Sequence, residues 1–250
     1  MKKLTYITAF IFCFLAVNAN AQPPNYDDLL IYFADGDYEK LIKKAEKYTL
    51  DDATKSDPIP YMYMAKGFFA IHKNPDGFKE DFTKNAIATA TRYAERAKKL
   101  DKEGVLDQDE TNSDFISNLK KYWLETIDNE ILTGNYGRAF GIVMKYGKLS
   151  EGDAGVSYLL GACKFQRNDK NGASKYWEEG DALLAKITST GDWKSEDYAM
   201  LKLGVLETAK ALKAYDELGE AQKLLNKVKQ WFEDDSEFMD IYNCYVNSKC

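Results

Sequence analysis

Apolar residues recur at steps of three and four positions along almost the whole chain, whereas alternation with a period of two hardly extends beyond four residues. The first spacing places apolar side chains on one side of an α-helix, and the second is typical of a half-buried strand. The pattern therefore predicts an all-α protein. We expect helices at about residues 29–33, 38–48, 59–71, 78–100, 115–131, 139–146, 156–165, 173–187, 196–215, 218–232 and 238–245.

Clusters of Gly, Asn, Asp and Pro separate these helices at residues 35–37, 74–77, 134–135, 168–170 and 190–192. Such residues favour turns and end helices. The expected helices therefore follow one another in pairs along the chain. Within the helix expected at residues 78–100, small side chains recur on one side and allow a neighbouring helix to approach closely: Ala86, Ala90, Ala94 and Ala97.

The first 21 residues have the pattern of a secretory signal peptide. Lys2 and Lys3 precede an apolar run over residues 4–17, and Ala19 and Ala21 supply the small side chains that signal peptidase requires. The apolar run is shorter than the roughly 20 residues that span a bilayer, which disfavours a membrane anchor. We therefore expect cleavage before Gln22 and an exported protein that is periplasmic or extracellular, with no stable membrane insertion.

Charge and composition narrow the function classes. The chain has 34 Lys and Arg against 40 Asp and Glu, a formal charge of −6. Removal of Lys2 and Lys3 with the signal peptide makes it −8, which disfavours a nucleic-acid partner, since that affinity rests on basic surfaces. A single His disfavours sites built from several imidazoles, and none of the common catalytic or phosphate-binding motifs is present. We predict no metal, no cofactor and no catalysis.

Three cysteines remain after cleavage: Cys163, Cys244 and Cys250. An odd number in an oxidising compartment permits at most one internal disulfide. Cys244 and Cys250 are close enough in sequence to close a terminal loop if the last helix ends near Val246. Cys163 lies in an apolar run and is expected to be a buried core residue, with a catalytic thiol as the weaker alternative.

The segment Gly134-Asn135-Tyr136-Gly137-Arg138-Ala139 resembles the entry to the second helix of a tetratricopeptide repeat (TPR), in which helix pairs stack into a solenoid. Trp123 stands where the first helix of such a repeat often carries Trp. The segment at residues 36–41 is similar to the same entry, with Leu41 in place of the small residue, and the pair at residues 160–161 is similar to the family's Leu-Gly pair.

This resemblance implies a right-handed solenoid of about five antiparallel helix pairs over residues 22–250, a single TPR-like domain. Equivalent positions are separated by 49, 49, 34 and 48 residues, of which only the third equals the family's repeat length, so the repeats are divergent: Leu41, Ala90, Ala139, Ala173 and Ala221. The register of the last repeat stays open, and a helical bundle without true repeats is the alternative.

The resemblance further implies a concave groove, lined by the first helix of each pair, that binds a protein or peptide partner. Its expected lining residues are Tyr61, Phe68, His72, Lys121, Asp128, Tyr158, Gln166 and Tyr198. The alternative for the Tyr and Phe side chains of this set is that they pack in the core. The alternative for His72 is a structural role at the end of a helix. Glu125, Asp128 and Glu130 are expected to form a solvated helix face.

The leading hypothesis is therefore an exported, non-enzymatic adaptor or scaffold that binds a protein or peptide of the cell envelope. The alternative is an envelope protein that binds a small molecule or glycan, because aromatic side chains on a rigid surface can stack on sugar rings. An enzyme of unrecognised type is the third hypothesis.

Overall fold

The computed structural model describes residues 24–249, and this part of the chain contains helices and no β-strand. The all-α prediction is confirmed. The predicted signal peptide at residues 1–21 lies outside the described residues, as does Cys250, so the expected cleavage before Gln22 and a Cys244–Cys250 bridge remain predictions.

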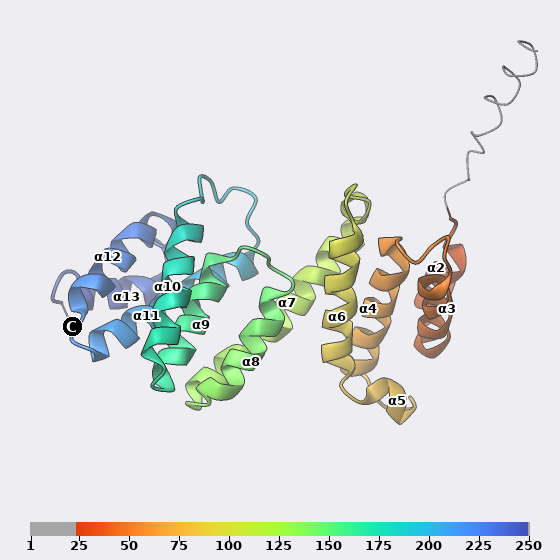
Figure 1. Ribbon diagram of the computed structural model, residues 1–250, viewed down its shortest axis with the longest axis horizontal. Helices are drawn as coiled ribbons and strands as arrows, with labels where there is room; N and C mark the ends of the chain where they lie inside the picture. Colours follow the sequence, from red (N-terminus) through yellow and green to blue (C-terminus); the bar gives the residue numbers. More distant parts are fainter. Residues whose placement is uncertain (1–23, 250) are drawn as a thin grey trace, which may run out of the picture.

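The helices follow one another along the long axis of the molecule, from α2 at one end to the last helices at the other (Figure 1). The first half of the described chain contains α2 (Asp27–Ala34), α3 (Tyr38–Leu50), α4 (Pro58–Lys73), α5 (Glu80–Thr83), α6 (Ala86–Leu100) and α7 (Glu110–Leu132). The second half contains α8 (Tyr136–Gly147), α9 (Ala154–Gln166), α10 (Lys170–Leu184), α11 (Ser195–Ala214), α12 (Leu218–Val228) and α13 (Ser236–Tyr245). Short 3-10 helices occupy Leu106–Gln108 and Lys229–Trp231.

Local sequence explains where these helices begin. An Asp side chain accepts a hydrogen bond from a backbone N–H in the first turn of several helices, which satisfies a group that has no partner within the helix. The capping residues are Asp37 for α3, Asp57 for α4, Asp109 for α7, Asp153 for α9, Asp169 for α10 and Asp235 for α13. Gly36 and Gly134 have φ values of 73° and 74°, which explains Gly at the turns before α3 and α8.

The prediction of a single long helix over residues 78–100 is wrong in its first part. The structure has a four-residue helix, α5, followed by a break at Lys84 and Asn85. Asn85 has φ 57° and ψ 25°, a left-handed conformation that Asn adopts more readily than most residues. This conformation ends α5 and redirects the chain into α6, whose stripe of Ala86, Ala90, Ala94 and Ala97 is buried as expected.

Neighbouring helices pack most extensively as α4 on α6, α9 on α10 and α9 on α11, and α4 and α6 lie side by side in Figure 1. Further contacts join α3 to α4, α7 to α8, α8 to α9 and α11 to α12. Two hydrophobic clusters result, one built mainly from α2 to α9 and the other from α9 to α13. Helix α9 contributes to both clusters and therefore links the two halves.

Helix α9 has an unusual environment, because every residue from Ala154 to Cys163 is buried. It packs against α8, α10 and α11, and α11 also contacts α7. A helix that is apolar on all sides is expected to be enclosed in this way. Helix α9 is therefore covered by its neighbours, and α7 and α11 border each other.

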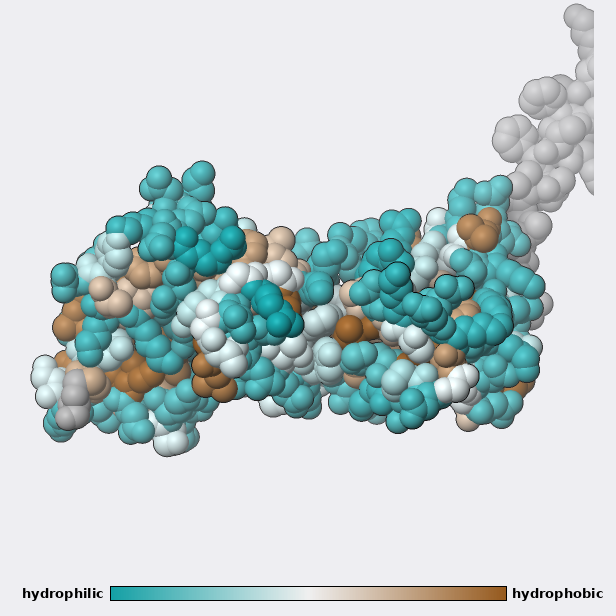
Figure 2. Space-filling view, turned by 90° about the horizontal axis from the view of Figure 1, so that it is seen from below, coloured by the Kyte–Doolittle hydropathy of each residue, from teal (hydrophilic) through white to brown (hydrophobic). Residues whose placement is uncertain are grey.

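Most of the face shown in Figure 2 is hydrophilic, with hydrophobic patches that are larger toward the end of the molecule that carries the C-terminal helices. Of the helices in residues 24–249, none is both long enough and apolar enough to cross a membrane.

Candidate functional site

The structure does not place the predicted groove residues on one surface. Phe68 on α4 stacks on Tyr93 of α6 with ring centroids 5.9 Å apart, and Tyr61 contacts the same ring at 6.5 Å. Phe68 is buried and belongs to the core, so its prediction as a groove residue is wrong. Tyr61 is half-buried, and it faces the partner helix α6 and donates a hydrogen bond to the carbonyl oxygen of Lys55.

Tyr158 is also a core residue, with 2% of its surface exposed. Its hydroxyl donates a hydrogen bond of 2.7 Å to Asp181, and its ring packs beneath Gly180 of α10. The prediction that Tyr158 lines a groove is wrong because α10 and α11 both pack on the helix that carries it.

His72 and Gln166 lie at helix ends. His72 is in the last turn of α4, where its ring meets Tyr122 of α7 edge-on at 4.9 Å, and burial lowers its pKa. Gln166 is the exposed last residue of α9. The structural alternative for His72 describes its position better than groove lining does.

The remaining predicted residues lie on the two helices that border each other. Lys121 on α7 has its Nζ 3.9 Å from Oε2 of Glu196 on α11. Asp128 on α7 and Tyr198 on α11 line two separate hollows of the surface. Of these three residues, Asp128 and Tyr198 therefore lie at different hollows and Lys121 lies outside both.

The first hollow lies between α7, α11 and α13 and has a volume of about 280 Å³. The half-buried Leu124 and Leu203 supply apolar surface, the buried Leu206 also borders this space, and we call it the leucine hollow. Glu125 and Asp128 are exposed on its α7 side. Together these side chains offer apolar contact next to negative charge.

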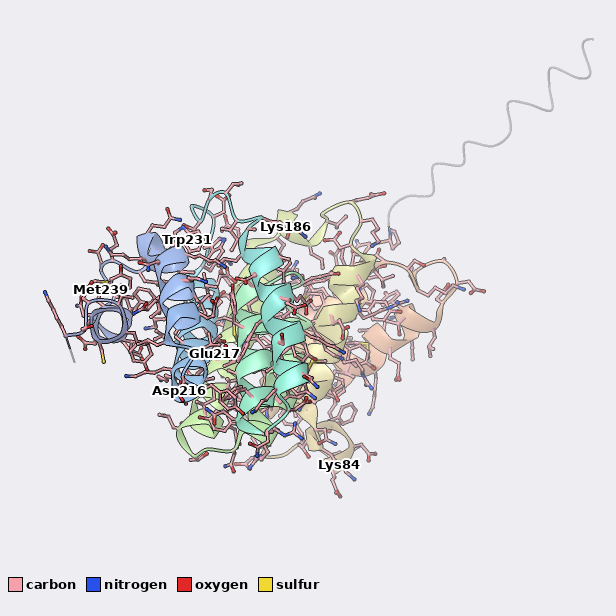
Figure 3. The ribbon with its side chains drawn as sticks, turned by 60° about the vertical axis from the view of Figure 1, so that its left-hand side comes forward. Lys84, Lys186, Asp216, Glu217, Trp231 and Met239 are labelled. Atoms are coloured by element: carbon pink, nitrogen blue, oxygen red, sulfur yellow. The ribbon has the colours of Figure 1, made fainter. Side chains whose placement is uncertain are left out.

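The second hollow lies between the start of α11 and residues 230–235, has a volume of about 460 Å³, and is called the tryptophan hollow here. Tyr198 and Trp231 line it, and both rings contact Trp193, at centroid distances of 5.2 and 6.4 Å. Figure 3 shows Trp231 at the end of α12, beside the loop that leads from Lys186 toward α11. The hollow therefore depends on contacts between a loop, α11 and the segment before α13.

The two hollows adjoin, because Ala199 and Lys202 line both. We call the combined surface the α11 groove. It follows α11 from Ser195 to Lys210, a length of roughly 22 Å at about 1.5 Å per helical residue. An extended chain rises about 3.3 Å per residue, so about six or seven residues of a peptide match this length.

Charge in the α11 groove is mainly negative. Its two lysines already have carboxylate partners: Lys202 Nζ lies 2.8 Å from Asp235 and 2.9 Å from Glu237, and Lys210 Nζ lies 2.7 Å from Glu207. Burial opposes the charged form of Lys202, yet its hydrogen bonds with the two carboxylates raise its pKa. Within residues 24–249, Glu125, Asp128 and Asp234 make no ion pair. The groove therefore has carboxylates that no cation of the described chain pairs with.

The expectation of a solvated acidic face on α7 is correct for Glu125 and Asp128 and wrong for Glu130. Glu130 is buried, and its Oε1 lies 3.0 Å from the guanidinium of Arg138 on α8. This ion pair joins the two helices of one pair, so Glu130 has a structural contact rather than a free surface.

Another hollow, of about 340 Å³, lies between α7, the segment after α6 and the segment before α11. Several of its charged groups bind other parts of the protein: Lys120 pairs with Asp197 at 2.8 Å, and Lys98 donates a hydrogen bond to the carbonyl oxygen of Leu149. Asp101 accepts hydrogen bonds from the backbone N–H groups of Val105 and Leu106. Among the described residues, Asp107 and Asp192 are the carboxylates of this hollow that make no ion pair or side-chain hydrogen bond, two against three in the α11 groove.

Within residues 24–249, no group of three or more His, Cys, Asp or Glu side chains is arranged to hold a metal ion. Burial, and then the nearby Glu207 carboxylate, raise the pKa of the Cys163 thiol to about 12. A thiol in this state is a poor nucleophile.

Sequence reasoning missed Trp231 and the three leucines. Trp231 is followed by Phe232 and then by an acidic run at residues 233–235, and two aromatic residues beside an acidic run are the signal that could have marked it. The leucines follow the same spacing as core residues, so nothing in the sequence distinguishes them.

Comparisons with known proteins give no functional assignment. No family model matches the chain, and no curated protein or solved structure is significantly similar to it.

Proposed function

We propose that the protein is an exported, non-enzymatic scaffold that binds an extended segment of a partner protein in the α11 groove. The observation that carries the proposal is the continuity of the two hollows through Ala199 and Lys202, with apolar surface and unpartnered carboxylates along it. Recognition of an extended peptide requires both anchoring pockets and polar groups at intervals along a groove.

The proposal includes a TPR-like solenoid whose helix pairs are α2 with α3, α4 with α6, α7 with α8, α9 with α10, and α11 with α12. Packing between the members of each pair supports it, as do the turns at Gly36 and Gly134, which are the glycines of the matched segments. The enclosed α9 departs from a regular solenoid. In the proposed arrangement this departure shifts the binding surface from α9 to the border of α7 and α11.

Export is proposed from the sequence of residues 1–21, with residues 22–250 as the mature chain. In the envelope, the acidic groove would meet other exported proteins rather than nucleic acid, and the partner is a protein or peptide of that compartment.

A steric block at Ala199 tests the proposal, because this half-buried residue lines both hollows. Peptides are selected from a random display library on the purified protein, and their affinity is then measured for the variants Ala199→Trp and Lys175→Trp. Lys175 is exposed on α10, outside the groove, and serves as the matched control. We expect at least a tenfold loss of affinity in Ala199→Trp and none in Lys175→Trp. Equal binding to both variants, or no selected peptide at all, would contradict the proposal.

A second candidate function is glycan binding in the tryptophan hollow. Tyr198 and Trp231 offer ring surface beside Gln230 and carboxylates, which are groups that contact sugar rings and hydroxyls. A glycan panel that raises the melting temperature of the protein, with the effect lost in Trp231→Ala, would favour this candidate.

A further inference from the structure

We infer that the α11 groove selects a cationic segment, with one basic side chain in the tryptophan hollow and a second beside Glu125 and Asp128. This inference rests on the proposed function and specifies the chemistry of the partner. Two independent observations support it: the distribution of unpaired carboxylates, and aromatic rings that no cation of the described chain covers.

The first observation concerns Glu125 and Asp128. They lie one turn apart on α7, are exposed, and face a hollow whose lysines are held by other carboxylates. Lys121, one turn before Glu125, lies within ion-pair distance of Glu196. A basic residue of a partner would therefore meet two carboxylates without competition from an intramolecular ion pair.

The second observation concerns the rings of the tryptophan hollow. Elsewhere in the molecule, lysines lie over aromatic rings, such as Lys170 over Tyr215 at 3.8 Å and Lys213 over Tyr245 at 4.2 Å. Among the described residues, no Lys or Arg lies over Tyr198 or Trp231.

Trp offers the strongest attraction of the aromatic side chains for a cation. Among residues 24–249, Asp234 lines the same hollow without an ion pair, and the ion-pair partner of Glu233 is Lys229, at 3.8 Å. A guanidinium or ammonium group placed here would gain both ring and carboxylate contacts. Arg fits best, because its planar group stacks on a ring while its N–H groups reach a carboxylate.

The length of α11 sets the spacing of the two basic residues. From Tyr198 to Leu206 the helix rises roughly 12 Å, which an extended peptide covers in about four residues. The structure thus favours an extended segment with an Arg, an apolar residue about four positions away for the leucine hollow, and a Lys or Arg next to it.

The direct probe is a fluorescein-labelled peptide of sequence Gly-Ser-Arg-Ala-Gly-Ala-Leu-Lys-Gly-Ser, compared with the same peptide carrying Gln in place of Arg and Lys. Affinities for the purified protein are measured by fluorescence anisotropy at two salt concentrations. We expect the basic peptide to bind at least tenfold more tightly, and this difference to shrink at high salt because screening weakens exposed charge pairs.

Three variants identify the residues responsible. The double variant Glu125→Gln with Asp128→Asn, and separately Trp231→Ala, are expected to reduce the affinity for the basic peptide at least fivefold. The double variant Glu178→Gln with Glu179→Gln makes the same change in net charge on the exposed side of α10, and it is expected to leave the affinity unchanged.

The outcomes separate this inference from the proposed function. Peptides from the display library that Ala199→Trp blocks, but that are not enriched in Arg and Lys, would overturn the cationic selectivity and leave the peptide-binding groove in place. An equal loss in the α10 control would show attraction to overall charge and also overturn it, as would a basic peptide that binds no better than its Gln counterpart. Binding that Ala199→Trp does not affect would overturn the groove itself.

Discussion

Gly204 of α11 lies directly against the carbonyl group of Gly155 in α9, with no room for a side chain between the two backbones. A β-carbon on Gly155 would in turn lie 2.6 Å from the Cα of Leu201. Such distances occur only where two helices touch through their main chains. This contact brings α11 onto α9 and so places Ala199 and Lys202 where they line both hollows of the α11 groove.

The first prediction concerns this contact. Gly204→Ala introduces a methyl group that meets backbone atoms, which cannot move aside as a flexible side chain would. Overpacking of this kind costs about 1–3 kcal/mol and occasionally more, and we expect about 2–3 kcal/mol of destabilisation. Urea unfolding followed by circular dichroism measures the change in the free energy of unfolding.

Gly141→Ala is the matched control. Gly141 is exposed in the interior of α8, and a β-carbon there would meet no atom within 4 Å. Because Ala favours a helix interior over Gly, this substitution is expected to stabilise the protein by about 0.5–1 kcal/mol. A Gly204→Ala protein as stable as the unchanged one would mean that α9 and α11 do not meet in this way.

Hydrophobic periodicity was sufficient to predict most of the helices, because most of them bury one side against their neighbours. It could not predict the break at Asn85, whose left-handed conformation leaves no periodic signal. The sequence also did not predict that α9 is enclosed, although this helix is apolar on all sides. The reason is that α11, which packs over α9, is distant from it in sequence. Of the residues predicted to line a groove, Asp128 on α7 and Tyr198 on α11 each line one of the two hollows, and their role in binding a partner stays a prediction.

The second prediction concerns Tyr158. Its replacement by Ala removes a fully enclosed ring between α9 and α10, and changes of this type typically cost about 3–5 kcal/mol. Tyr158→Phe keeps the ring and loses only the hydrogen bond to Asp181, so about 1 kcal/mol is expected. Tyr198→Ala, at a half-buried groove position, should cost less stability than Tyr158→Ala.

Thermal and urea unfolding of the three variants give this order directly. If Tyr158→Ala were tolerated while it weakened peptide binding, Tyr158 would be a groove residue after all, and the enclosed position of α9 would be incorrect.

The third prediction concerns pH and the carboxyl group of Asp153. Burial raises its pKa to about 6, although the N–H groups of Val156 and Gly155, which it caps, and nearby Lys120 act in the opposite direction. In the unfolded chain the pKa of an Asp is about 3.9, so the folded protein binds this proton more tightly than the unfolded chain does. The contribution of Asp153 to stability is therefore greatest below about pH 4 and is lost as the pH rises to about 6.

Asp153→Asn removes the titration and keeps a side chain that caps helices well. Relative to the unchanged protein, the variant should gain about 2–3 kcal/mol in the free energy of unfolding between pH 4 and pH 7, because each pKa unit corresponds to about 1.4 kcal/mol. Urea unfolding of both proteins at several pH values measures this difference. A difference that does not vary with pH would show that the Asp153 carboxyl has an ordinary pKa in the folded protein.

The fourth prediction concerns the thiol of Cys163, which is fully buried in α9 and has a pKa of about 12 because of burial and the nearby Glu207. Only the thiolate reacts with alkylating reagents, so iodoacetamide at pH 8 should leave Cys163 unmodified in the native protein and modify it in urea. Mass spectrometry of peptides that contain residue 163 measures the extent of reaction.

Since Gly155 and Gly204 hold α11 over α9, the destabilised Gly204→Ala variant should open more often, and its Cys163 should react faster than that of Gly141→Ala under native conditions. Rapid modification of the unchanged native protein would contradict the enclosed position of Cys163 and would reopen the catalytic alternative for this thiol.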